Sequence, residues 1–174
     1  MYTLILVPCT KILSFRTVLS FCNWNLNTLS LRNFRRISLL EAQNTIFEYD
    51  IISLCEPSLK DEIQVPEAIL PGYHYHPLNH PHGRKSGGVG IFYKENLPLR
   101  VSTNLSFDEC LVCELTSGRK RIFLTVFYQD PEHKAESVGF EDFLTNFETM
   151  HEKIRSENPF AIFFTSDVNR HSQE

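Results

Sequence analysis

The chain has 174 residues, of which 42% are hydrophobic and 22% charged, with 14 phenylalanines. This composition is typical of one globular domain with a sizeable core and excludes an intrinsically disordered chain. The formal net charge of -4 excludes the overall basic character that often marks nucleic-acid-binding proteins.

The first 17 residues are predicted to be a leader of unknown role. Before Glu41 the chain has no acidic residue, whereas its basic residues there are Lys11, Arg16, Arg32, Arg35 and Arg36. Such a bias occurs in mitochondrial transit peptides, but "MYTLILVPCTKILSF" lacks their amphipathic pattern, and the alternative is a disordered or strand-forming leader. No apolar run reaches the roughly 18 residues that a membrane-spanning helix needs, so we expect a soluble chain without a membrane partner.

The cysteines are scattered along the chain, at Cys9, Cys22, Cys55, Cys110 and Cys113. An odd, scattered set is unlike a secreted disulfide framework and favours a reducing, intracellular compartment, nuclear or cytoplasmic. The pair in "CLVC" lies in an apolar segment with strand character, where residues three apart point to opposite faces. We therefore expect Cys110 and Cys113 to be core residues and not zinc ligands.

Predicted strands and helices alternate along the chain. The strands share apolar, β-branched and aromatic residues bounded by turn residues, and they cover 17–27, 50–56, 73–78, 87–94, 109–118, 120–129 and 160–167. We expect Gly118 in the turn between the two strands that flank it. The chain shows no internal repeat and no low-complexity linker, so the sequence predicts one α/β domain.

Two helices are predicted between these strands. Over 38–49, Ser38 and Glu41 have the spacing of a capping box. Over 139–158, the apolar residues recur at helical spacing, and they are Phe140, Phe143, Leu144, Phe147, Met150 or His151, and Ile154. This stripe predicts the face that the second helix buries against the core.

Polar side chains stand where four predicted strands end. They are Asn25 and Asn27, Glu56, Tyr128 and Gln129, and Asp167 and Asn169. A hard divalent cation prefers oxygen ligands, and a phosphate prefers hydrogen-bond donors, so this set suits metal-assisted phosphoester hydrolysis. Each residue alone also has an ordinary interpretation as a solvated turn or loop residue.

Five blocks of the chain resemble a known family in the expected order. They are "NLNTLSLRNF", "YDIISLCEPSL", "GGVGIFYK", "VFYQDP" and "FFTSDVNRHS". They are similar to the motif blocks of the endonuclease/exonuclease/phosphatase superfamily, and closest to the endonuclease domain of non-LTR (long interspersed element) retrotransposon polyproteins. The resemblance implies an α/β fold, the αββα sandwich of that superfamily, over residues 18–174 and incomplete at its C-terminus.

The resemblance also implies roles for five residues. Glu56 would be the metal ligand, and Asn25 would shape the metal and phosphate site beside it. Tyr128 would contact the scissile phosphate, Asp167 would orient or activate the attacking water, and Asn169 would hold a phosphate oxygen. The implied cofactor is Mg²⁺ (or Mn²⁺), and the implied substrate is DNA, nicked to expose a 3′ hydroxyl for reverse transcription.

The chain departs from the family pattern at several positions. Ser166, Val168, Pro57 and Gln129 replace the usual Gly, Phe, Thr and Arg, and the family's C-terminal Ser-Asp-His block has no counterpart. We therefore expect a fragment of an endonuclease that is inactive by itself because its acid/base pair is missing. The alternatives are a non-enzymatic remnant or binding module of the same fold, and a domain active only when joined to a missing segment.

Four histidines crowd the segment "YHYHPLNHPHG", at His74, His76, His80 and His82. Residues two apart on a strand share a face, so the geometry allows a transition-metal site. No Cys or carboxylate lies nearby to complete a tetrahedral set, and the alternative is a polar strand and loop. In the resembling family this segment would lie along the DNA backbone.

Overall fold

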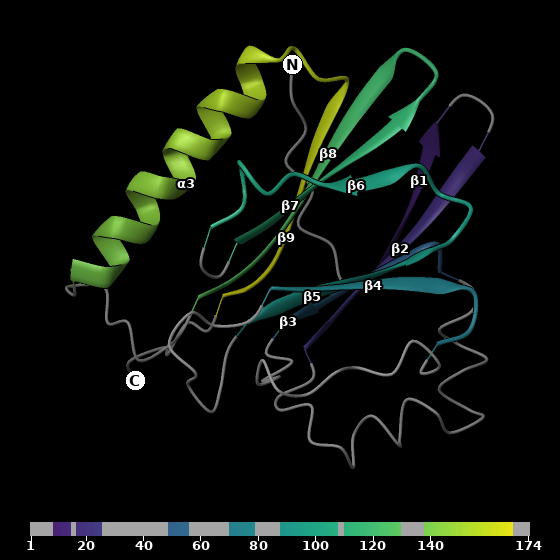
Figure 1. Cartoon of the computed structure of the whole chain (residues 1–174), viewed down its shortest axis with the longest axis horizontal. Helices are drawn as coiled ribbons and strands as arrows, with labels where there is room; N and C mark the ends of the chain where they lie inside the picture. Colours follow the sequence, from purple (N-terminus) through teal and green to yellow (C-terminus); the bar gives the residue numbers. More distant parts are fainter. Residues whose placement is uncertain are drawn as a thin grey trace.

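The computed structural model describes residues 9–14, 17–25, 49–55, 70–78, 88–107, 110–129 and 138–168. Within these ranges the chain forms two mixed β-sheets and the helix labelled α3 in Figure 1. Among the described residues, no helix has the length and apolar character to cross a membrane.

The first sheet has five strands in the order β1-β2-β3-β5-β4. Their bounds are β1 (Cys9–Ser14), β2 (Thr17–Asn25), β3 (Ile51–Cys55), β4 (Tyr73–Leu78) and β5 (Val89–Lys94). β2 and β3 run parallel, whereas the pairs β1–β2, β3–β5 and β4–β5 are antiparallel. Residues 9–14 of the predicted leader thus form a strand at one edge of this sheet.

The second sheet has four strands in the order β6-β7-β8-β9. Their bounds are β6 (Leu99–Val101), β7 (Cys110–Ser117), β8 (Lys120–Gln129) and β9 (Ala161–Val168). β8 and β9 run parallel, and the pairs β6–β7 and β7–β8 are antiparallel. Gly118 makes the turn between β7 and β8 with a φ of 61°, a value that glycine adopts readily.

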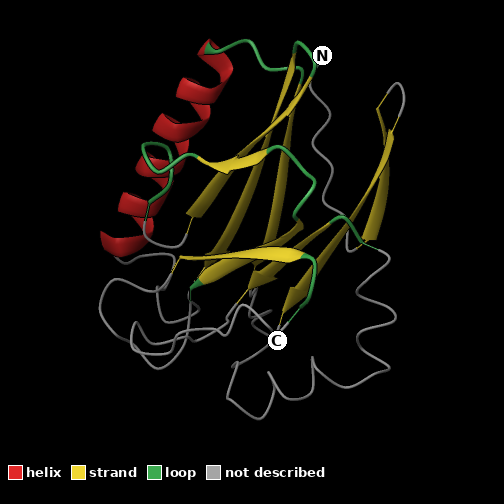
Figure 2. Ribbon diagram, turned by 45° about the vertical axis from the view of Figure 1, so that its right-hand side comes forward, coloured by secondary structure: helices red, strands yellow, loops and turns green. Residues whose placement is uncertain are grey.

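The two sheets pack face to face around the main core. Alternate residues of the central strands point inward from each sheet, among them Ile51, Val89 and Ile91 from the first and Leu111, Leu124 and Val126 from the second. α3 (Val138–Ser156) covers the outer face of the second sheet, as Figure 2 shows. The order of layers is therefore sheet, sheet, helix, which is the sandwich that the resemblance implied, described here with one helical layer.

The helix stripe is confirmed at four positions, Phe143, Phe147, Met150 and Ile154, and the side chain of Phe140 lies outside the described part. Phe147 and Phe143 pack toward the sheet, and Met150 and Ile154 are buried with exposed fractions of 3% and 0%. Leu144 is 45% exposed, so its placement in the stripe was wrong. Successive residues of a helix are rotated by about 100° around its axis, so position 144 lies to one side of the line through positions 143, 147, 150 and 154.

The two cysteines of "CLVC" lie on opposite faces of β7, as predicted. Cys110 packs under α3, and Cys113 packs between the sheets. Both are free thiols, and burial raises the pKa of each, to about 12 for Cys113. They are core residues.

Asp50 joins three strands of the first sheet at the start of β3. Its Oδ2 accepts hydrogen bonds from the backbone N–H and the hydroxyl of Ser20 on β2, both at 2.9 Å. Its Oδ1 lies 2.8 Å from Nζ of Lys94, the last residue of β5. These contacts hold the strands in register at the end opposite Asn25 and Cys55.

Seven strands were predicted from the sequence, and all seven are present. In chain order they are β2, β3, β4, β5, β7, β8 and β9. The sequence did not predict β6, which is only three residues long. The predicted helix over 38–49 lies outside the described residues, apart from its last position.

Candidate functional site

The strands that carry the predicted site residues run in parallel pairs. In the first sheet Asn25 pairs in register with Cys55, the residue before Glu56. In the second sheet Tyr128 pairs with Asp167. Because parallel strands end at the same edge of a sheet, each pair brings its candidate residues to one edge.

Two contacts join these edges across the sandwich. Asn23 Nδ2 on β2 donates to the carbonyl oxygen of Ser166 on β9 at 3.3 Å. Cys55 Sγ on β3 lies 3.8 Å from the carbonyl oxygen of Phe127 on β8, a weak thiol hydrogen bond. We call the four strand-end positions Asn25, Cys55, Tyr128 and Asp167 the strand-end rim, since these contacts bring the ends of all four strands to the same end of the sandwich.

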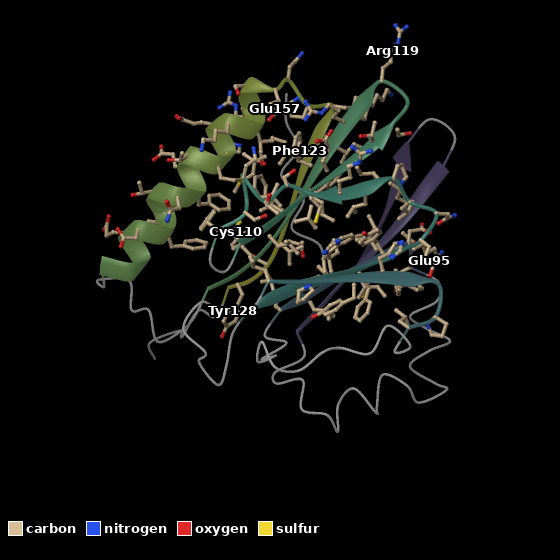
Figure 3. The ribbon with its side chains drawn as sticks, viewed as in Figure 1. Glu95, Cys110, Arg119, Phe123, Tyr128 and Glu157 are labelled. Carbon is tan, nitrogen blue, oxygen red and sulfur yellow. The ribbon has the colours of Figure 1, made fainter. Side chains whose placement is uncertain are left out.

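Tyr128 is the predicted site residue whose side chain is described. It lies at the end of β8 away from the turn that contains Arg119 (Figure 3). The ring belongs to the core between the sheets, and only 2% of the residue is exposed. Packing therefore holds its ring in one place.

Of the other predicted site residues, the structure describes the backbone of two. Asn25 and Asp167 are the last and the next-to-last residues of β2 and β9, and their side chains lie outside the described part. Glu56 and Asn169 lie outside the described residues, each next to a described strand end.

The chemistry of the rim suits a hard divalent cation. The rim and the residues that directly follow it carry two carboxylates, from Glu56 and Asp167, and a carboxamide from Asn25. Mg²⁺ takes one or two protein carboxylates and keeps several waters, so this sparse set of oxygen donors fits it. Among the described residues, no group of three or more His, Cys, Asp and Glu side chains forms a metal cluster.

A polar cluster beside the rim, largely buried, was missed in the sequence. It consists of Asn23, Ser53 and Thr165, which occupy inward positions of otherwise apolar strands. Ser53 and Thr165 have exposed fractions of 0% and 5%. Strand alternation could have found them, because polar residues at positions of core parity need partners when they are buried.

His74 and His76 share one face of β4, as the spacing predicted. Both rings contact Tyr93 on the neighbouring strand: His74 is tilted against it at a centroid distance of 5.3 Å, and His76 stacks on it at 6.0 Å. Burial, and then the charge of His74, lowers the pKa of His76. The described residues supply no third ligand there, and His80 and His82 lie outside them.

Comparison with known proteins finds similarity at the level of the fold. No protein-family model and no curated protein sequence matches the chain. The endonuclease domain of TRAS1, a telomere-specific non-LTR retrotransposon, is 16% identical with a TM-score of 0.62, over 87% of this chain and 61% of that one. The APE2 catalytic domain of Xenopus laevis is 20% identical with a TM-score of 0.61, over 86% and 58%.

A third solved structure, truncated TDP2 of Caenorhabditis elegans, is 19% identical with a TM-score of 0.59, over 89% of this chain and 64% of that one. All three belong to the endonuclease/exonuclease/phosphatase superfamily, and this chain has the fold of that superfamily. The chain spans less than two thirds of the length of each.

Proposed function

We propose that this chain is a metal-dependent phosphodiester hydrolase domain, a DNA endonuclease of retrotransposon origin. The observation that supports this best is the meeting of four strand ends from two sheets, which the contacts Asn23–Ser166 and Cys55–Phe127 join at 3.3 and 3.8 Å. Those ends carry carboxylates, carboxamides and a tyrosine. The TRAS1 endonuclease domain among the structural neighbours supports a retrotransposon origin.

In this proposal each predicted site residue at or beside the rim has one task. Glu56 would hold Mg²⁺ or Mn²⁺, with Asn25 shaping the metal and phosphate site beside it, and the ion would supply Lewis-acid stabilisation of the charge that develops on the phosphate. Tyr128 would donate a hydrogen bond to the scissile phosphate. Asp167 would accept a proton from the attacking water and orient it, and Asn169 would donate to a phosphate oxygen.

We further propose that the 174-residue chain by itself hydrolyses DNA very slowly. Its sequence contains no Ser-Asp-His block, the block that would supply the acid/base histidine and its orienting aspartate. General acid/base catalysis typically contributes about 10² to 10⁴ in rate. Without that block the domain would bind the ion and the phosphate backbone but would not cleave efficiently. Such behaviour is also what the alternative, a binding module of the same fold, would show.

Two measurements test the proposal on the purified chain. Titration with Mn²⁺, followed by electron paramagnetic resonance, should show binding that Glu56→Gln weakens at least about tenfold, since the amide loses the anionic donor. Equal binding by both proteins would place the ion elsewhere. Nicking of supercoiled plasmid DNA in Mg²⁺ should not exceed the level of Asp167→Ala, and robust nicking that Asp167→Ala abolishes would overturn the proposed inactivity.

A further inference from the structure

Two buried side chains and one half-buried side chain beside the strand-end rim form a closed hydrogen-bonded ring between the sheets. Ser53 Oγ on β3 lies 2.6 Å from Asn23 Oδ1 on β2 and 3.2 Å from Thr165 Oγ1 on β9. Asn23 Nδ2 then donates to the carbonyl oxygen of Ser166, also on β9, at 3.3 Å. The ring thus leaves β9, passes through β3 and β2, and returns to β9 one residue further along.

Counting protons assigns a direction to every bond in this ring. The carbonyl of Ser166 can only accept, so the amide NH₂ of Asn23 faces it and Asn23 Oδ1 faces Ser53. The single Ser53 hydroxyl proton is directed to Asn23 Oδ1, the shorter contact. Thr165 must therefore donate to Ser53. Each of the three side chains has one arrangement that satisfies the ring.

The position of the ring matters because the other buried residues described between the sheets pack as a hydrophobic cluster. Packing between apolar side chains has no directional preference, whereas hydrogen bonds fix the distance and the angle between their groups. Asn23 lies two residues before Asn25, Ser53 three before Glu56, and Thr165 two before Asp167. Among the described residues, the ring and the weaker Cys55–Phe127 thiol contact are thus directional contacts between the sheets close to the proposed metal and phosphate residues.

We propose that Asn23, Ser53 and Thr165 are positioning residues, which set the separation between the metal-binding strand ends of the first sheet and the phosphate-binding strand ends of the second. This rests on the proposed function of the rim. None of the three touches the ion or the substrate in this scheme. They act through the backbone of β2, β3 and β9.

Two substitutions of Thr165 separate hydrogen bonding from packing. Thr165→Val keeps the shape and removes the hydroxyl, while Thr165→Ser keeps the hydroxyl and removes a methyl group. Thr125→Val is the matched control, since it makes the same change on the outer face of β8, where the buried Oγ1 has no hydrogen-bond partner among the described residues. Ser53→Ala is a second way to open the ring.

Mn²⁺ affinity is the first measurement, by electron paramagnetic resonance on the full 174-residue chain. Thr165→Val and Ser53→Ala should weaken binding about tenfold, the lower end of what indirect partners of a metal site contribute. Thr165→Ser and Thr125→Val should bind as the natural chain does. Full affinity in both ring variants, or an equal loss in Thr165→Ser, would overturn the proposal, since the second result would indicate packing alone.

Amide hydrogen exchange is the second measurement and needs no metal. Thr165→Val should speed exchange at residues 166–168 about fivefold to tenfold, as the loss of a net hydrogen bond predicts, and leave the middle of β7 unchanged. If the natural chain binds no Mn²⁺, or if Glu56→Gln binds Mn²⁺ equally well, the proposed function fails. Hydrogen exchange then decides by itself whether the ring positions the strand ends, and unchanged exchange at residues 166–168 would overturn that role.

Discussion

Asp50 gives the sharpest prediction about stability, because one carboxylate joins β2, β3 and β5. In Asp50→Asn, the amide oxygen can still accept from Ser20, but an NH₂ group then faces the ammonium of Lys94. The change therefore removes the ion pair at 2.8 Å and leaves two donors opposed. A hydrogen bond to a charged group contributes about 1.5–3 kcal/mol in general. Because Lys94 and Asp50 are 31% and 20% exposed, we expect a loss of about 1–2 kcal/mol at pH 7.

The effect should depend on pH in a defined direction. Burial alone raises the pKa of Asp50, but the hydrogen bonds from Lys94 and Ser20 together lower it below its ordinary value. A carboxyl with a depressed pKa in the folded protein contributes stability above its unfolded pKa, about 3.9, and loses it as the pH falls through the folded value. The difference in unfolding free energy between Asp50→Asn and the natural chain should thus have its full value at pH 7 and should shrink below about pH 4.

Urea denaturation followed by circular dichroism at pH 7 and pH 3 measures this difference. Glu95→Gln is the matched control, since it neutralises an exposed carboxylate beside Lys94 and should change the unfolding free energy by less than about 0.5 kcal/mol. Equal stability of Asp50→Asn and the natural chain at pH 7, or the same loss of stability at both pH values, would contradict this role of the Asp50–Lys94 pair.

Two further substitutions test the packing. Ile154→Ala on the buried face of α3, at 0% exposure, should lower the unfolding free energy by about 3 kcal/mol. Leu144→Ala on the same helix, at 45% exposure, should lower it by less than about 1 kcal/mol, and similar losses for both variants in urea titrations would contradict the described helix face. Gly90→Ala would place a methyl carbon 2.7 Å from the Tyr75 hydroxyl oxygen and should lower the unfolding free energy by about 1–3 kcal/mol. Adding Tyr75→Phe, which removes that buried hydroxyl, should recover part of this loss. No recovery would mean that other atoms of the Tyr75 ring make the clash.

Much of the fold follows from local patterns in the sequence. Short apolar segments bounded by turn residues predicted seven of the described strands, and the helical spacing of phenylalanines predicted α3. The opposite faces of Cys110 and Cys113 followed from strand alternation alone. The exposed Leu144 was the exception, because an apolar residue at the margin of a helical stripe is buried only if the sheet reaches it.

The sequence predicted some features of the candidate site and left others open. The sequence by itself indicated that Asn25, Glu56, Tyr128 and Asp167 stand at strand ends, and their motif order indicated the superfamily whose fold the chain has. The roles of these residues stay predictions. No local pattern could say which strands lie beside one another, since sheet order depends on contacts between distant segments.

Only the tertiary structure decided how the two sheets meet. β1 pairs with β2, although its sequence does not distinguish an edge strand from a leader. The ring through Asn23, Ser53 and Thr165 joins residues 30 and 112 positions apart, and its bonds form only when two inward faces pack together. A polar residue on an apolar strand face shows that a partner is needed, but the partner is chosen by the packing of the sheets, because hydrogen bonds require groups within about 3 Å.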